Sequence, residues 1–258
     1  MLKYHRLIIA FSLVFLALLA ISPASEFIIW AVGLLIFIFI SIIAIGAASM
    51  RYQIFVSAYT QAGIADKRIA LTFDDGPGEK TTAVLALLQK YGAKATFFCI
   101  GKNAEKYPLV LKQIHEQGHI IGNHSYAHQH IFNLFGSQRM AREIDKTGTI
   151  IEKLIGAKPL LFRPPHGVTN PPTARAVRRL GLQVVGWSIR TYDTVRSVNE
   201  TLIRKITAKI RPGSVILLHE HMESSEVLLE GILKFVAEND YACVGVDELF
   251  KIKAYAQA

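Results

Sequence analysis

Residues 69–77 read Ile69-Ala70-Leu71-Thr72-Phe73-Asp74-Asp75-Gly76-Pro77, an apolar run that ends in two carboxylates and a turn. The run from Ile69 to Phe73, closed by Gly-Pro, is typical of a buried strand. An isolated Asp-Asp-Gly-Pro is usually only a turn. However, adjacent side chains on an extended segment diverge, so Asp74 and Asp75 can serve two tasks, one binding a metal and one moving protons.

Outward from this segment, short apolar runs alternate with helical patterns. The further strand-like runs cover 95–100, 119–121, 160–162, 182–187, 214–218 and 241–246. Ser137 and Asn170 are expected to cap two of the intervening helices. Such alternation predicts one α/β domain over 67–258, a parallel sheet covered by helices that closes or nearly closes into a barrel. Its catalytic groups are then expected at the C-terminal ends of the strands.

Two histidines follow the third strand-like run, in Gly122-Asn123-His124-Ser125-Tyr126-Ala127-His128. Histidines four residues apart can meet one cation when their segment coils into a helical turn. With one aspartate they offer two nitrogens and one oxygen and leave a position for water, as catalytic zinc requires. Taken alone, such a pair is more often a feature of a surface helix.

Polar residues follow three more strands in the same way. Phe162 precedes Arg163-Pro164-Pro165-His166-Gly167, Trp187 precedes Arg190 and Asp193, and Leu217-Leu218 precedes His219-Glu220-His221. Each has an ordinary structural interpretation, and His219 alone can be a hydrogen-bonded residue at the rim. Their repetition at successive strand ends instead indicates one catalytic site at the C-terminal edge of the sheet.

Four of these segments resemble the ordered motifs of polysaccharide deacetylases, the NodB-homology enzymes of carbohydrate esterase family 4. The segments are 72–77, 124–128, 163–167 and 217–219, and the resemblance covers about 67–250. A combination of motifs in order is far more specific than any one of them. The resemblance implies a distorted (β/α)7 barrel.

The resemblance also implies a role for each matching residue. Asp74 and His219 resemble the general base and the general acid of the family. The metal ligands would be Asp75, His124 and His128, while Arg163 would orient the base and Asp193 would support the acid.

The resemblance further implies a substrate pocket walled by Leu217 and Trp187, with an oxyanion contact from the backbone N–H of His166. His166 stands where the family usually has tyrosine, which changes the pocket wall. Arg190 stands where many members have an acidic residue, and Thr194 where they have tryptophan. A cationic Arg190 suits an anionic or phosphate-bearing substrate, or it forms an ion pair with a neighbouring carboxylate.

The implied activity is the metal-dependent removal of an N-acetyl group from an amino sugar, in an envelope polysaccharide or a lipid-linked saccharide. Zinc is the expected metal, although an aspartate and two histidines also accept cobalt or nickel. Alternatives are an O-acetyl esterase, a deformylase on a similar substrate, and an inactive carbohydrate-binding membrane protein. The last is disfavoured because the sequence retains all of the catalytic groups.

The first fifty residues are expected to form a membrane anchor, joined to the domain by a linker over 51–66. Two apolar runs, 7–22 and 27–48, approach or exceed the ~20 residues that cross a bilayer. The first run also has the pattern of a signal peptide, with Lys3 and Arg6 as its basic lead. The second run follows almost at once, which favours a helical hairpin in the bacterial inner membrane.

The side of the membrane on which the domain lies stays open. Lys3, Arg6 and Arg51 flank the two runs, and the positive-inside rule then places both ends in the cytoplasm. A cleaved or re-entrant first run would instead place the domain outside.

The charge of the chain favours anionic surfaces. Of the formal net charge of +9, Lys3, Arg6 and Glu26 contribute +1, which leaves +8 for the remainder. A basic domain beside a membrane favours anionic headgroups and phosphate-bearing or acidic substrates. No nucleic-acid-binding motif is present, so nucleic acid is not an expected partner, and nothing in the sequence indicates a protein partner. Cys99 and Cys243 are expected as buried thiols, with a disulfide as the alternative.

Overall fold

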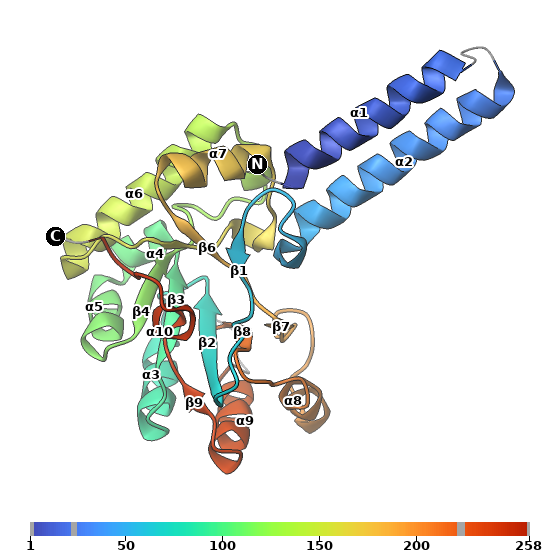
Figure 1. The fold of residues 1–258 in the computed structure, drawn as a ribbon. Coiled ribbons are helices and arrows are strands. Elements are labelled where there is room, and N and C mark those ends of the chain that lie inside the picture. Colours follow the sequence, from blue (N-terminus) through green and yellow to red (C-terminus); the bar gives the residue numbers. More distant parts are fainter. Residues whose placement is uncertain (1–2, 22–24, 221–224, 257–258) are drawn as a thin grey trace.

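The computed structural model describes residues 3–21, 25–220 and 225–256, and its α/β domain is built around one buried strand (Figure 1). Strand β2 (Arg68–Asp74) is buried at every residue after Arg68. A continuous apolar run of this kind suits a central strand that is covered on both faces. β2 pairs in parallel with β3 (Ala95–Cys99) and β8 (Val215–His219), which places Asp74 in register with His219.

The sheet carries parallel strands in the order β1-β6-β5-β4-β3-β2-β8-β7, and β9 pairs with the start of β2. Helices cover the outer side of the curled sheet (Figure 1), which confirms the predicted distorted (β/α)7 barrel. The two-residue strands β1 and β7 were not predicted, whereas β5 and β9, which are equally short, lie within predicted strand-like runs. The remaining strands are β1 (Ala58–Tyr59), β4 (Ile120–Asn123), β5 (Leu161–Phe162), β6 (Gln183–Val185), β7 (Ile189–Arg190) and β9 (Ala242–Cys243).

The helices pack on this sheet through apolar faces, and the rings of Phe73 and Phe97 stack 4.9 Å apart beneath them. Asn170 caps its helix as predicted, since its side chain accepts from the backbone N–H of Thr173 at 2.8 Å. The predicted cap at Ser137 is wrong, because Gly136 occupies the cap position and no side chain bonds there. The helices of the domain are α3 (Thr81–Lys90), α4 (Gly101–Lys106), α5 (Pro108–Glu116), α6 (Ser137–Ile155), α7 (Pro171–Arg179), α8 (Glu200–Thr207), α9 (Ser225–Glu238) and α10 (Val246–Phe250), with short 3-10 turns η1 (Met50–Tyr52), η2 (Phe132–Leu134) and η3 (Pro165–Gly167).

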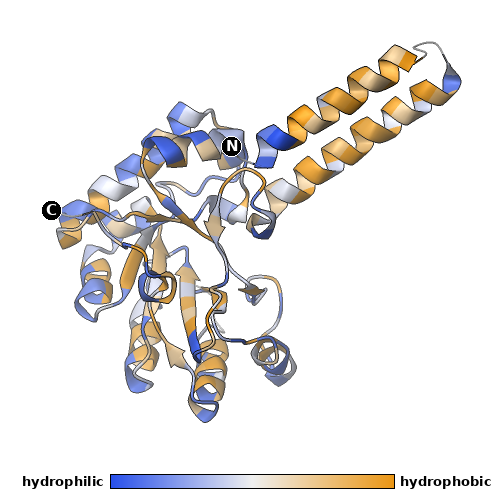
Figure 2. Ribbon diagram, in the orientation of Figure 1, coloured by the Kyte–Doolittle hydropathy of each residue, from blue (hydrophilic) through white to orange (hydrophobic). Residues whose placement is uncertain are grey.

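A helical hairpin, α1 (Lys3–Ile21) and α2 (Glu26–Ala48), extends away from the domain and is apolar on nearly all sides (Figure 2). Its helices are 19 and 23 residues long and are long and apolar enough to cross a membrane. Large side chains such as Trp30 point outward, 79% exposed. A helix that is apolar all round and unburied in the protein itself is suited to a lipid environment. Residues 22–24, which follow the run with the signal-peptide pattern, lie outside the described residues.

The base of the hairpin is attached to the domain by several backbone contacts. Lys3 Nζ donates to the carbonyl of Tyr52 at 3.0 Å, and Tyr4 N donates to the carbonyl of Ile54 at 3.0 Å. On the second helix, the carbonyl of Ala47 accepts from Thr169 N at 3.0 Å. The hairpin therefore contacts the loop that follows η3, and η3 itself contains His166.

The segment 51–66, expected as a linker, is part of the packed domain. It contributes β1, which pairs with β6, and it buries Phe55 and Val56 in the core. Apolar residues in this segment find a buried surface beside the sheet, so the α/β unit begins before residue 67. Cys99 and Cys243 are both buried and free, as predicted.

Candidate functional site

The C-terminal edge of the sheet gathers every residue predicted to bind metal or move protons. Asp74 ends β2, and His219 ends the neighbouring strand β8. The remaining predicted residues lie in the loops that follow the strands: Asp75 after β2, His124 and His128 after β4, Arg163 after β5, and Asp193 after β7.

Three of these residues form a potential metal site. The ligand atoms of Asp75, His124 and His128 all lie within 4.8 Å of one another. Asp75 Oδ1 is 3.7 Å from His124 Nε2 and 3.5 Å from His128 Nε2. These separations exceed a hydrogen bond but match donors arranged around one cation with bonds of about 2 Å.

The local backbone turns these ligands toward one another. Asp75 and His128 have φ values of 73° and 45°, in the left-handed region that non-glycine residues seldom adopt. The loop between the histidines is fixed because Asn123 Oδ1 accepts from Ser125 N at 2.9 Å. Strained conformations of this kind persist where the surroundings impose them, which occurs most often at functional sites.

Each histidine has the state that metal binding requires. His124 Nδ1 lies 2.7 Å from the carbonyl of Arg163, so a proton on Nδ1 leaves Nε2 free to ligate. Burial, together with the electrostatic interaction with the neighbouring His124, lowers the pKa of His128 to about 4. His128 is therefore neutral at physiological pH, as a ligand must be.

Asp74 is held by a fully buried arginine. Arg163 Nη1 donates to Asp74 Oδ1 at 2.7 Å and to Thr72 Oγ1 at 2.9 Å. Its Nε and Nη2 donate to the carbonyls of Val185 and Gly186 at 3.1 and 2.8 Å. Burial alone would raise the pKa of Asp74, but the Arg163 guanidinium, with His124 and His219, brings that pKa below its usual value. Asp74 is therefore an ionised carboxylate with a fixed orientation.

His219 is paired with a second carboxylate. Its Nδ1 lies 2.9 Å from Asp193 Oδ1, and its backbone N donates to Asp193 Oδ2 at 2.8 Å. Burial would lower the pKa of His219, but the hydrogen bond to Asp193 and the charge of Asp74 raise it above its usual value. The imidazolium form is thus favoured, and Nδ1 is the ring nitrogen that faces Asp193.

The predicted substrate residues surround these groups. The ring of His166 (φ 59°) lies 4.6 Å from that of His128, beside the potential metal site. Leu217 is buried in β8, and Trp187 lies 5.6 Å from the Arg163 guanidinium. Arg190 is exposed at the end of β7, and its guanidinium lies 5.9 Å from the Trp187 ring.

Two further residues belong to the site although sequence reasoning gave them no role. The ring of His130 stacks on that of His166, with 5.7 Å between the ring centroids and an interplanar angle of 11°. Glu220 is 1% exposed, and both of its carboxylate oxygens lack a hydrogen-bond partner among the described residues. Burial raises the pKa of Glu220 to about 8. The only signal in the sequence was their closeness to His128 and His219.

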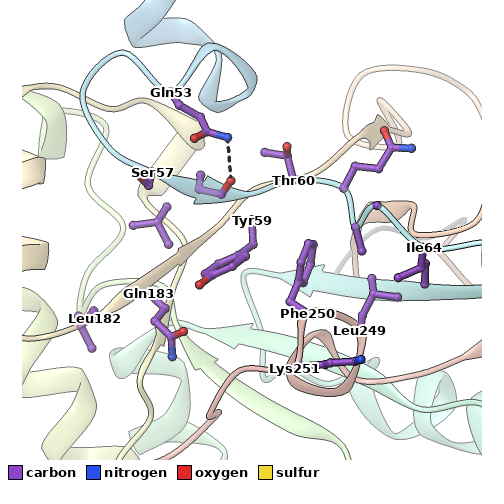
Figure 3. A pocket seen from close by; sticks show the side chains of 15 residues that line it. Gln53, Ser57, Tyr59, Thr60, Ile64, Leu182, Gln183, Leu249, Phe250 and Lys251 are labelled. Carbon is purple, nitrogen blue, oxygen red and sulfur yellow. Dashed lines mark hydrogen bonds between the residues drawn. The ribbon is translucent and has the colours of Figure 1, made fainter. Parts of the chain in front are cut away.

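A cavity of about 710 Å³ lies away from this site, between β1, the start of β6 and α10 (Figure 3). Its wall includes Tyr59, Gln183 and Phe250, and Gln53 Nε2 donates to the carbonyl of Ala58 at 3.3 Å at its edge. None of the catalytic or metal-binding candidates lines it, so cavity size does not identify the site here.

The fold and the site define a class of protein, a parallel (β/α) barrel with an aspartate–histidine–histidine cluster beside an arginine-paired aspartate and an aspartate-paired histidine. The sequence profile described as polysaccharide deacetylase matches residues 62–185. The chain belongs to the polysaccharide deacetylase family, carbohydrate esterase family 4.

Individual relatives agree with this assignment. A peptidoglycan-N-acetylglucosamine deacetylase of Bacillus cereus is 36% identical over 182 residues, which cover 68% of this chain. The chain spans 66% of that relative and as little as 39% of other peptidoglycan deacetylases that it matches. The crystal structure of the Bc1960 peptidoglycan N-acetylglucosamine deacetylase superposes with a TM-score of 0.72 and 31% identity, over 76% of this chain and 94% of that one.

The same fold also occurs without activity. The structure of BA3943, described as a pseudoenzyme of this family from Bacillus anthracis, superposes with a TM-score of 0.68 and 26% identity, over 74% of this chain and 67% of that one. Family membership alone therefore does not decide activity, and the residues of the site must be judged individually.

Proposed function

We propose that this protein is a metal-dependent hydrolase that removes an N-acetyl group from an amino sugar of the cell envelope. The observation that carries the proposal is the convergence of three ligands and two oriented proton carriers at one strand edge. A pseudoenzyme would be expected to lack part of such a set, whereas this chain keeps all of it. The alternative of an inactive carbohydrate-binding protein is therefore disfavoured.

Asp75, His124 and His128 would hold the metal. Their two imidazole nitrogens and one carboxylate oxygen fit zinc and leave room for water and substrate, and cobalt or nickel fits the same set. When bound, a divalent cation supplies Lewis-acid chemistry, acidifying water and polarising the acyl oxygen.

Asp74 would act as the general base. An ionised carboxylate with a lowered pKa accepts a proton only when water is activated, and the Arg163 contact keeps it aimed at one position. Oxyanion stabilisation would come from the backbone N–H at His166, on the loop beside His128.

His219 would act as the general acid. The amine of an amide is a poor leaving group until it is protonated, so cleavage requires a donor on its side of the bond. The raised pKa of His219 keeps this proton available, and Asp193 stabilises the charged ring. The surroundings thus favour the deprotonated form of Asp74 and the protonated form of His219, as an acid–base pair requires.

The substrate class follows from the relatives and the anchor together. The similar deacetylases named above act on peptidoglycan, and the hairpin gives this chain two helices suited to crossing a membrane. We propose that the protein is held at the inner membrane and that its substrate is an N-acetylated saccharide there, in a polymer or on a lipid. Which side the domain faces would be decided by protease protection of residues after Met50 in intact cells and inverted vesicles.

The proposed reaction is tested with the purified full chain. A chitin oligosaccharide and an O-acetylated xylan oligosaccharide would be supplied after chelation and again after Zn²⁺, Co²⁺ or Ni²⁺ is restored. We expect acetate release from the chitin oligosaccharide, lost on chelation and regained with metal. Release from the xylan substrate alone would establish the O-acetyl esterase, and an N-formyl oligosaccharide would detect the deformylase in the same assay. Activity that survives complete metal removal would overturn the proposal.

A further inference from the structure

A cavity of about 370 Å³ lies where the membrane hairpin meets the mouth of the barrel. The end of α2 and η1 form one wall, and the segment from Trp187 to Tyr192 forms another. None of its lining residues is acidic, and three are cationic: Arg51, Arg190 and Lys209.

These cations have no anionic partner in the part of the chain that the structure describes. Arg51, Arg190 and Lys209 are exposed, and none of the ion pairs or side-chain hydrogen bonds among the described residues involves them. The ion pair considered for Arg190 is therefore not formed. Its guanidinium instead lies 5.2 Å from the Tyr192 ring and 5.9 Å from the Trp187 ring. Such stacking holds an arginine in place while its N–H groups stay available for an anion.

The cavity adjoins the catalytic site through Trp187. The Trp187 ring lines the cavity. Its other edge packs so closely on Gly167, next to His166, that a Cβ added to this glycine would lie only 2.2 Å from the ring. Further along, Arg190 and Tyr192 are exposed, whereas Thr191 and Asp193 are buried. The segment that begins with β7 thus presents Arg190 and Tyr192 to the cavity and Asp193 to His219.

The cavity also adjoins the proposed membrane surface. The apolar helix α2 ends at Ala48, and Arg51 is the first charged residue after it. Because backbone contacts attach the hairpin base to the domain, the cavity is fixed near the end of the span. This is the depth at which lipid phosphates lie, and cations placed there are attracted to anionic headgroups.

We propose that this cavity binds the phosphate group of a membrane lipid, and that the amino sugar to be deacetylated is linked to that lipid. The inference rests on the proposed function and names its substrate class. A phosphate held by Arg51, Arg190 and Lys209 would leave its lipid tail beside α2 and place an attached sugar past Trp187, toward Asp74 and His219. Arginine and lysine without acidic neighbours are the side chains that bind phosphate in this way.

The chain offers a direct reporter of this cavity. It has two tryptophans, Trp30 in α2 and Trp187 in the cavity wall. In the Trp30→Phe protein, purified in maltoside micelles that contain no phosphate, the fluorescence comes from Trp187 alone. The probes are farnesyl phosphate, uncharged farnesol, dioleoyl phosphatidylglycerol and inorganic phosphate.

We expect farnesyl phosphate to change the emission saturably and farnesol to leave it unchanged. The double variant Arg190→Gln/Lys209→Gln should weaken binding at least about tenfold. Lys112→Gln, which removes an exposed cation from α5, is the matched control and should bind as the parent does. No saturable change with farnesyl phosphate, an equal change with farnesol, or unaltered affinity in the double variant would overturn the proposal.

The remaining probes identify the source of the phosphate. Binding of inorganic phosphate as tightly as farnesyl phosphate would overturn the assignment to a lipid. Binding of phosphatidylglycerol as tightly as farnesyl phosphate would keep the phosphate site but overturn the link to the substrate. Deacetylation of a soluble chitin oligosaccharide, assayed on the same samples, separates the proposed function from the proposed lipid site. Lipid binding without acetate release would contradict the proposed function and leave the assignment of the cavity standing.

Discussion

The two sides of the site are held in different ways. On the side proposed to transfer protons, Asp74 forms an ion pair with Arg163 at 2.7 Å, and His219 forms one with Asp193 at 2.9 Å. On the metal side, the ligand atoms of Asp75, His124 and His128 approach only to 3.5 Å and depend on loops with left-handed backbone. The first side is organised by the protein itself, and the second has a geometry that a cation would complete. The two sides should therefore respond differently to the same kind of substitution.

The largest expected effect separates the two adjacent carboxylates. Asp75→Ala or His128→Ala should abolish metal binding and turnover together, because each removes one of three ligands. Asp74→Asn should keep the metal and the shape around Arg163, yet lower kcat by about 10²–10⁴-fold, since it removes the proton acceptor. Metal content by mass spectrometry and acetate release measure the two properties. Equal loss of metal in all three variants would remove Asp74 from its role as base.

A smaller effect is expected when the partner of Asp74 is changed. Arg163→Lys keeps a positive charge but cannot make the contacts to Val185 and Gly186 as well as that to Asp74. Loss of hydrogen bonds around a buried ion pair costs about 3 kcal/mol, so Tm should fall and kcat should drop by roughly 10²-fold with metal retained. Arg175→Lys, at an exposed position of α7, is the control and should change neither. Full activity in Arg163→Lys would show that orientation of Asp74 is unimportant.

Sequence reasoning reached the site because its residues follow strand ends, and strand ends of a parallel sheet meet at one edge. Asp74, His124 and Arg163 could be placed there from pattern and family motifs, without coordinates. The distances and the partners of each carboxylate could not, since they depend on turns such as the one at Asp75.

What the sequence did not predict depends on packing between distant segments. The strand β1 was not predicted, and it is stabilised by pairing with β6 more than a hundred residues away. The burial of Glu220 depends on the absence of a side chain at Gly76, where a Cβ would lie 1.5 Å from Oε1. The charge of the cavity at the hairpin base arises because Arg51 and Lys209 meet only in the folded chain.

The pKa of His219 can also be changed without replacing His219 itself. The proposed reaction requires Asp74 without a proton and His219 with one, so the pH profile of kcat/KM should be bell-shaped. Asp193 raises the pKa of His219; Asp193→Asn should therefore lower that pKa and move the alkaline limb to lower pH. Asp145→Asn, which alters an exposed ion pair with Lys158, should leave the profile unchanged. An unmoved alkaline limb in Asp193→Asn would assign that limb to another group.

The smallest expected effect concerns Glu220, which lies between the two sides but is paired with neither. Because burial raises its pKa to about 8 from an ordinary 4.5, the folded protein binds this proton more tightly than the unfolded chain does. The stability of the metal-free protein should therefore fall as pH rises from about 4.5 to about 8 and then level off. Glu220→Gln keeps the shape of the side chain without the charge, so its Tm should match the wild type near pH 4.5 and exceed it by several degrees near pH 8.5. Glu238→Gln, at an exposed position of α9, controls for the loss of one carboxylate. Parallel pH curves for wild type and Glu220→Gln would mean that the carboxylate is stabilised in its ionised form, which would make it an electrostatic part of the metal side after all.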